Sequence, residues 1–158
     1  MLTTRLVPSP VGELTLVGSP RGLRYVLWAG EPPPEPCLTA GCDVLDEAAR
    51  QLSAYFAGDL RRFDLPLDLV GTDFQVEAWR ALADIPYGTT RSYGAQARRL
   101  GRPRAVRAVG AANGRNPLPI VLPCHRVVGA DGSLVGFGGG LAVKRLLLEH
   151  EALVAMRR

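Results

Sequence analysis

The chain is poor in the residue types that build disulfide frameworks and metal sites. Its 158 residues include three cysteines and two histidines. An odd number of cysteines argues against a closed set of disulfides and is typical of a reducing compartment. Cys37 and Cys42 have no histidine or second cysteine pair near them in the sequence. We therefore expect neither a metal ion nor a cofactor.

Long apolar runs are also missing. None approaches the roughly 20 residues that a membrane-spanning helix needs, and the N-terminus lacks the basic, apolar and small-residue order of a signal peptide. We expect a cytoplasmic protein that does not contact a membrane. The apolar fraction of 47% and the charged fraction of 22% are ordinary for a globular chain with a buried core.

Positive charge is concentrated in the second half of the chain. Residues 1–68 carry six arginines against nine acidic residues, whereas residues 69–158 carry thirteen basic residues against six acidic ones. Such a bias arises either from a solvated face or from a contact surface for a polyanion. Six arginines of this half follow one another with no acidic residue between them: Arg98, Arg99, Arg102, Arg104, Arg107 and Arg115.

The pattern of apolar residues predicts an α+β protein with two domains, residues 1–68 and 69–158. In the first domain, alternation predicts a small antiparallel sheet with strands at residues 4–7, 13–18 and 23–28. A proline-rich surface loop at residues 31–36 precedes a predicted helix over residues 43–56.

The second domain is predicted to be mostly helical and to contain a helix-turn-helix. Thr72 can cap a helix whose third residue is Gln75, and this helix ends near Ile85. Two shorter helices joined by a turn with a glycine are typical of a helix-turn-helix. They are predicted at residues 92–100, with Ser92 as the cap, and at residues 104–112.

The second helix of this pair has small residues where a base-reading helix has polar ones. Asn, Gln and Ser are absent from it before Asn113, and Arg107 is its long side chain. Such a helix could enter a groove closely without reading the sequence, while Arg107 fills the space of a displaced base. Alternatively, its alanines are good helix formers that pack against a neighbouring element.

The most informative motif is Pro123-Cys124-His125-Arg126-Val127-Val128. The apolar residues 118–122 before it predict that the backbone around Cys124 is buried. A thiol next to an imidazole is a candidate nucleophile, and it needs a base because the thiolate is the reactive form. Adjacent side chains diverge, so we expect His125 to reach the sulfur through a water molecule. The alternative is a buried structural cysteine beside a hydrogen-bonded histidine.

This motif, with Arg107-Ala108-Val109-Gly110 and Asn116-Pro117, closely resembles the O6-alkylguanine-DNA alkyltransferases, also called methylated-DNA–protein-cysteine methyltransferases. The resemblance runs from Gly71 to about Glu151, and more loosely includes residues 9–14. It implies a ribonuclease-H-like first domain and a winged-helix-like second domain. Phe137 stands where many members have a tyrosine, and Val106 replaces a small residue.

The resemblance also implies a role for each matching residue. Cys124 would accept the alkyl group, His125 would act as its base through water, Glu151 would orient that histidine, and Asn116 would tie the helix-turn-helix to the active-site loop. Tyr93 would help to rotate the nucleotide and donate a hydrogen bond to the base, and Arg107 would replace the flipped nucleotide. The other matching residues would lie in the minor groove (Ala105, Ala108, Gly110) or line the pocket (Val127 and residues 135–139, including Phe137 and Gly138).

The implied activity is DNA repair by a single-use transfer of the alkyl group from O6-alkylguanine to Cys124 after nucleotide flipping. The implied partner is double-stranded DNA, bound through the minor groove with low sequence specificity by a monomer located at the nucleoid. The sequence leaves open whether binding is cooperative, which alkyl groups react, and whether O4-alkylthymine does.

Three other functions are compatible with parts of the sequence. A lesion sensor without catalysis would lack the reactive cysteine, which this chain has. A cysteine hydrolase using Cys124 and His125 would need an oxyanion site and would not need a DNA-binding helix pair. A transcription regulator is disfavoured by the small residues of the second helix.

Overall fold

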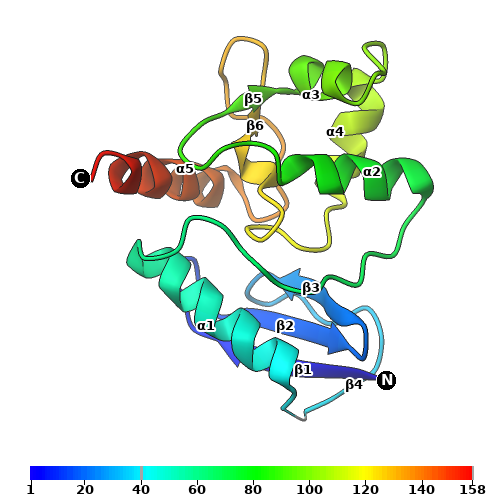
Figure 1. The fold of residues 1–158 in the computed structure, drawn as a ribbon, viewed down its shortest axis with the longest axis vertical. Coiled ribbons are helices and arrows are strands. Elements are labelled where there is room, and N and C mark those ends of the chain that lie inside the picture. The colour runs from blue at the N-terminus through cyan, green and yellow to red at the C-terminus, as the bar shows by residue number, and fades with distance from the viewer. Residues whose placement is uncertain (40, 158) are drawn as a thin grey trace. The chain divides into compact units, whose positions relative to one another are not determined.

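The computed structural model describes residues 1–39 and 41–157, and the chain divides into two compact units, Met1–Val70 and Gly71–Arg158. Figure 1 shows the helices and strands of both units. Each unit combines at least one helix with a short sheet, which confirms the predicted α+β class. Within the described residues, no helix is both long enough and apolar enough to cross a membrane.

The first unit is built on a four-stranded sheet. Its strands are β1 (Leu2–Val7), β2 (Leu14–Ser19), β3 (Gly22–Leu27) and β4 (Cys37–Leu38), in the order β3-β2-β1-β4. The pairs β1–β2 and β2–β3 are antiparallel, as predicted, whereas β4 runs parallel to β1. The sequence did not reveal β4, because two residues are too few to show alternation.

Helix α1 (Asp43–Ala57) packs against this sheet and buries Leu45, Leu52 and Tyr55 completely. A glycine on β2 lets the helix approach closely. A Cβ atom added at Gly18 would lie 3.0 Å from Leu45 Cδ2, which is tighter than an ordinary contact. The helix ends at Gly58, whose φ of +82° places it in the left-handed region that favours glycine.

The chain after α1 returns along β3. The buried amide of Gln51 bonds both the backbone N–H and the carbonyl of Asp64, each at 2.9 Å. Leu23 then exchanges backbone hydrogen bonds with Pro66 and Asp68. A side chain at Gly22 could not fit there, because its Cβ would lie 2.4 Å from the Pro66 carbonyl oxygen.

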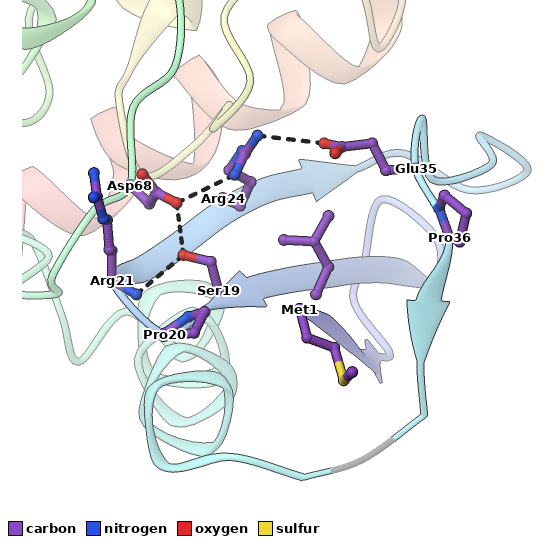
Figure 2. Close-up of a pocket in the computed structure, with 9 residues that line it drawn as sticks. Met1, Ser19, Pro20, Arg21, Arg24, Glu35, Pro36 and Asp68 are labelled. Carbon is purple, nitrogen blue, oxygen red and sulfur yellow. Dashed lines mark hydrogen bonds and ion pairs between the residues drawn. The ribbon is translucent and has the colours of Figure 1, made fainter.

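A surface pocket of this unit is lined by charged residues that bond to one another (Figure 2). Arg24 forms ion pairs of 3.3 Å with both Asp68 and Glu35, and the Ser19 hydroxyl donates to Asp68 at 2.6 Å. These contacts join β2 and β3 to the segments on either side of them. All the residues that line the pocket belong to the first unit.

The second unit contains the predicted helices. They are α2 (Asp73–Leu82), α3 (Tyr93–Arg99) and α4 (Val106–Gly114), followed by α5 (Leu141–Ala155), which the sequence reading did not predict. The capping box of Thr72 and Gln75 is present, with bonds of 3.0 and 3.1 Å. Ser92 caps α3 by accepting from the N–H of Ala95. Both predicted caps are thus confirmed.

Helix α4 begins and ends two residues later than predicted. The Ala105 N–H donates to the Arg102 carbonyl, so residues 102–105 form a tight turn, and the first helical bond runs from Val109 N–H to Ala105. Ala105 is consequently the residue before the helix, with φ −88° and ψ 28°. The predicted start at Arg104 was wrong because this turn extends beyond Pro103.

Three helices of the second unit are joined by buried polar contacts. Gln96 of α3 and Asn113 of α4 exchange side-chain amide hydrogen bonds of 2.9 and 3.3 Å. The indole N–H of Trp79, on α2, donates to the Ala112 carbonyl at 2.7 Å. Because these groups are buried, each bond also avoids the cost of an unpaired polar atom. The three helices are therefore fixed relative to one another.

Candidate active site around Cys124

An apolar loop between α4 and Cys124 is held at both ends by Asn116. The Asn116 side-chain oxygen accepts from the Leu118 N–H at 3.0 Å, and its amide donates to the Leu122 carbonyl at 2.9 Å. Within the loop, buried Ile120 has a φ of +75°. A β-branched residue in this region is strained by about 1–3 kcal/mol. The surrounding contacts must outweigh that strain to hold the loop in this shape.

We expect Asn116→Ala to destabilise the second unit by about 1–3 kcal/mol, because the backbone groups of Leu118 and Leu122 lose a hydrogen-bond partner. The Cys124 thiol should also react more slowly with iodoacetamide, since the interaction with Asn116 lowers its pKa. Urea unfolding and mass analysis of the Cys124 peptide measure the two effects. Asn116→Asp keeps the acceptor for the Leu118 N–H and should lose less unfolding free energy. An equal loss of unfolding free energy in both variants would contradict the view that Asn116 holds both ends of the loop.

Cys124 follows this loop in a short helical turn, η1 (Cys124–Arg126), and is 7% exposed. Burial of the sequence around it, predicted from residues 118–122, is confirmed. Burial raises the pKa of Cys124 to about 11, although the Asn116 amide and the Lys144 ammonium act in the opposite direction. The thiol is therefore protonated at pH 7, and a base must take the proton during reaction.

The adjacent His125 is oriented by a buried carboxylate. Its Nε2 lies 2.6 Å from Glu151 Oε2, and both side chains are completely buried. Burial lowers the pKa of His125 more than Glu151 raises it, so the imidazole is neutral at pH 7. Glu151 accepts the proton of Nε2, which leaves Nδ1 as the basic nitrogen. Nδ1 is buried and has no hydrogen-bond partner among the described residues.

Glu151 is itself held in the ionised form. Burial raises its pKa, but the hydrogen bonds and charges of His125 and Arg126 outweigh this and lower the pKa to about 2. Arg126 donates to Glu151 from Nε at 2.8 Å and from a terminal nitrogen at 3.1 Å, so it binds both carboxylate oxygens. The other terminal nitrogen of Arg126 donates to the Ile85 carbonyl at 2.8 Å.

Tyr93 is brought to the site by two very short strands. β5 (Arg91–Ser92) pairs in parallel with β6 (Val127–Val128), which places the start of α3 beside the chain leaving Cys124. The Tyr93 hydroxyl donates to the Val135 carbonyl at 3.2 Å, and a Cβ atom added at Gly110 would lie 3.9 Å from the Tyr93 ring. The structure therefore places Tyr93 beside Val135 and Gly110, at the start of a helix that contacts β6.

The exposed surface of α4 is smooth and basic. Arg107, Ala108 and Ala111 are exposed, whereas Ala105 and Gly110 are half-buried. All six arginines of the predicted block are exposed. Arg102 bonds Glu77 at 3.1 Å; Arg98, Arg99, Arg104, Arg107 and Arg115 form no ion pair within the described residues.

Two residues of the site were missed by sequence reasoning. Arg126 lies inside the quoted motif, but its role depends on Glu151, 25 positions away. Lys144 is completely buried, and its ammonium donates to the Val135 carbonyl at 3.0 Å. Lys144 is the single lysine of the chain, and this rarity was the available signal. Phe137 is half-buried near that ammonium, and Gly138 next to it is exposed.

The arrangement can perform nucleophilic chemistry. A buried thiol lies next in sequence to a neutral imidazole whose partner carboxylate directs the free nitrogen, as activated nucleophiles require. Among residues 1–39 and 41–157, no three His, Cys, Asp or Glu side chains gather as a metal site would need. Cys37 donates to the Glu35 carbonyl and Cys42 contacts the Thr3 hydroxyl, so neither belongs to this site.

Both units match known protein families. Residues 2–69 match the family described as "6-O-methylguanine DNA methyltransferase, ribonuclease-like domain", and residues 73–153 match "6-O-methylguanine DNA methyltransferase, DNA binding domain". The two matches together extend over most of the chain.

Similar proteins match along nearly their whole length. A methylated-DNA–protein-cysteine methyltransferase of Mycobacterium bovis is 50% identical, with 96% of this chain and 93% of that protein covered. One from Methanosarcina acetivorans is 48% identical, with 90% and 94% covered. The crystal structure of Mycobacterium tuberculosis OGT in complex with DNA superposes with a TM-score of 0.90 at 48% identity, covering 96% and 94% of the two chains.

Proposed function

Because this chain belongs to the 6-O-methylguanine DNA methyltransferase family, we propose that it repairs DNA by moving the alkyl group of O6-alkylguanine onto Cys124. The observation that carries the assignment to this residue is the buried Cys124 thiol beside His125, whose Nε2 is bound to Glu151 and whose Nδ1 is free to accept a proton. The relatives named above support the reaction, and the geometry supports the choice of residues.

In the proposed reaction, a sulfur–carbon bond forms as the bond between that carbon and guanine O6 breaks. The thiol proton passes through a water molecule to Nδ1 of His125, and Glu151 stabilises the imidazolium that results. Guanine leaves with the electron pair of the broken bond and takes a proton from water, and His125 returns the thiol proton to water, so the protons balance. The product is a thioether on Cys124, which nothing in the proposed mechanism removes, so each molecule acts once.

Departure of the guanine is easier when donors meet its developing negative charge. The Tyr93 hydroxyl is proposed to supply one, after it leaves the Val135 carbonyl to which it donates in this structure. The 135–139 loop, with Phe137 and Gly138, and Val127 would line the base pocket. Burial raises the pKa of Tyr93, so its hydroxyl keeps its proton and can donate at neutral pH.

The DNA partner is proposed to lie along α4 in the minor groove. Exposed arginines without carboxylate partners would contact phosphates, giving affinity that depends on salt and little on sequence. The small residues Ala105, Ala108 and Gly110 would let the helix approach closely. The protein would act as a monomer on nucleoid DNA in the cytoplasm, and cooperative binding is an open extension of this proposal.

Arg107→Ala should slow the repair of duplex DNA about tenfold or more, because the extruded nucleotide would leave an unfilled gap. Reaction with the free base O6-benzylguanine should change much less, since no base pair is opened. Single-turnover rates on both substrates measure the difference. Arg98→Ala removes the same charge from α3 and should weaken DNA binding most at low salt, because one phosphate contact is lost. An equal loss of rate on both substrates in Arg107→Ala would contradict the proposed role of Arg107.

Mass spectrometry tests the proposed function directly. The protein is incubated with a duplex that carries one O6-methylguanine, and the tryptic peptide containing Cys124 should gain the mass of one methylene group. A matched duplex with guanine should cause no gain. Binding to the lesion without any mass gain would overturn alkyl transfer and leave the sensor function in its place.

A further inference from the structure

The single lysine of this chain is placed in its interior. The chain has eighteen arginines and one lysine, Lys144, whose relative exposure is 0%. Lysine side chains are almost never fully buried unless their charge is paired. The neighbouring Arg145 of α5 is exposed. A buried lysine does not contribute to the solubility of the protein, so the burial of Lys144 needs another explanation.

The contacts of Lys144 hold its ammonium group without neutralising it. It donates to the Val135 carbonyl at 3.0 Å and lies 5.9 Å from the ring centres of both Tyr93 and Phe137. A carbonyl and two aromatic faces attract a cation but carry no net negative charge. Within the described residues, Lys144 forms no ion pair with a carboxylate.

The buried carboxylate of the site already has partners. Glu151 is bound by both Arg126 and His125. Tyr93 and His125 are neutral at pH 7, because burial raises the pKa of the first and lowers that of the second. Lys144 is thus a buried positive charge without a carboxylate partner among the described residues, and Cys124 is a group that becomes negative during reaction.

We propose that the buried ammonium group of Lys144 is the counter-charge of the Cys124 thiolate, held in place by the Val135 carbonyl and the rings of Tyr93 and Phe137. Lys144 acts through the sulfur and does not contact the alkyl group, so it is a positioning residue. The proposal deepens the proposed function, since it explains how a buried thiol loses its proton. The same carbonyl keeps one donor when the Tyr93 hydroxyl turns toward the base.

Helix α5, which carries Lys144, packs against η1, which carries Cys124, and the electrostatics agree with this placement. The positive charge of Lys144 lowers the pKa of Cys124, against the larger effect of burial. Reciprocally, burial lowers the pKa of Lys144 and the charge of the Cys124 thiolate raises it. Coupling between two groups acts equally in both directions. Each residue therefore reports on the ionisation of the other.

Thiol reactivity tests the proposal without DNA. Lys144→Met should slow iodoacetamide alkylation of Cys124 about tenfold at pH 8, with the difference narrowing at more alkaline pH. Lys144→Arg keeps the charge and should recover most of the rate, while Arg145→Met removes a surface charge from the same helix and should leave the rate unchanged. Mass analysis of the Cys124 peptide separates it from Cys37 and Cys42. A slower rate with an unshifted pH profile would overturn the proposal and leave a structural role.

A second measurement needs no change at Lys144. Labelling with lysine whose Nζ is nitrogen-15 gives one side-chain signal, because the chain has one lysine. In the wild-type protein this signal should shift as Cys124 ionises, and the shift should vanish in Cys124→Ala. Identical titrations in the two proteins would overturn the proposal. Since neither measurement uses O6-alkylguanine, a failure here is distinct from a failure of alkyl transfer, which the mass gain on DNA tests.

Discussion

Alanine at position 124 is expected to abolish methyl transfer and to leave DNA binding nearly unchanged. The thiol is the proposed acceptor, and the side chain lies inside the unit with 7% of its surface exposed, so its removal leaves the exposed arginines in place. Filter retention of labelled methyl measures transfer, and a mobility shift on an intact duplex measures binding.

The two other cysteines provide matched controls for this variant. Cys37→Ala and Cys42→Ala remove thiols from the first unit and should transfer at the wild-type rate. Labelled methyl retained by Cys124→Ala would show that another atom accepts it. A loss of binding together with transfer would mean that the substitution had disturbed the fold, which urea unfolding would detect.

The second large effect is expected for Glu151→Gln, which should lose about 3–5 kcal/mol of unfolding free energy. Arg126 would then be left as a buried charge without its carboxylate, and breaking one side of a buried ion pair is strongly destabilising. Transfer should also fall sharply, because neutral glutamine cannot stabilise a protonated His125. Glu149→Gln, on the exposed side of the same helix, should cost little.

The pH dependence of stability gives an independent check on Glu151. Its pKa falls from an ordinary value of 4.5 to about 2 in the folded protein, so its contribution is present above pH 4.5 and is lost as the pH falls toward 2. The lowered pKa of His125 acts in the same direction below its ordinary value of 6.5. The stability gap between wild type and Glu151→Gln should therefore shrink in acid. A gap that stays constant from pH 7 to pH 3 would contradict the assignment.

The helices and the sheet could be predicted where their signals are local. The capping box of Thr72 and Gln75 and the cap at Ser92 lie within four residues of the bonds that they form. The predicted start of helix α4 is two residues too early. The turn at residues 102–105 depends on one backbone hydrogen bond, and the presence of Pro103 in the sequence does not indicate where that turn ends. Strands β5 and β6 are two residues long and pair across more than thirty positions, so no periodicity could show them.

The site residues also differ in whether the local sequence indicates their role. Cys124 and His125 are adjacent, and their residue types alone indicated nucleophilic chemistry. The carboxylate at Glu151 came from a family resemblance, because nothing in the local pattern links a residue of α5 to a motif 25 positions earlier. Arg126 and Lys144 act through tertiary contacts with Glu151 and Val135, so their importance becomes visible once the chain is folded.

The loop bracketed by Asn116 also bears on what kind of enzyme this can be. Most enzymes must let product go, and a rigid reactive loop would slow every cycle. A protein that keeps its product for good has no such cycle to slow. It can tolerate the left-handed backbone of Ile120 and fix both ends of the loop, since flexibility there would serve no later turnover. A rigid loop beside the nucleophile therefore does not reduce the activity of a protein whose proposed reaction occurs once.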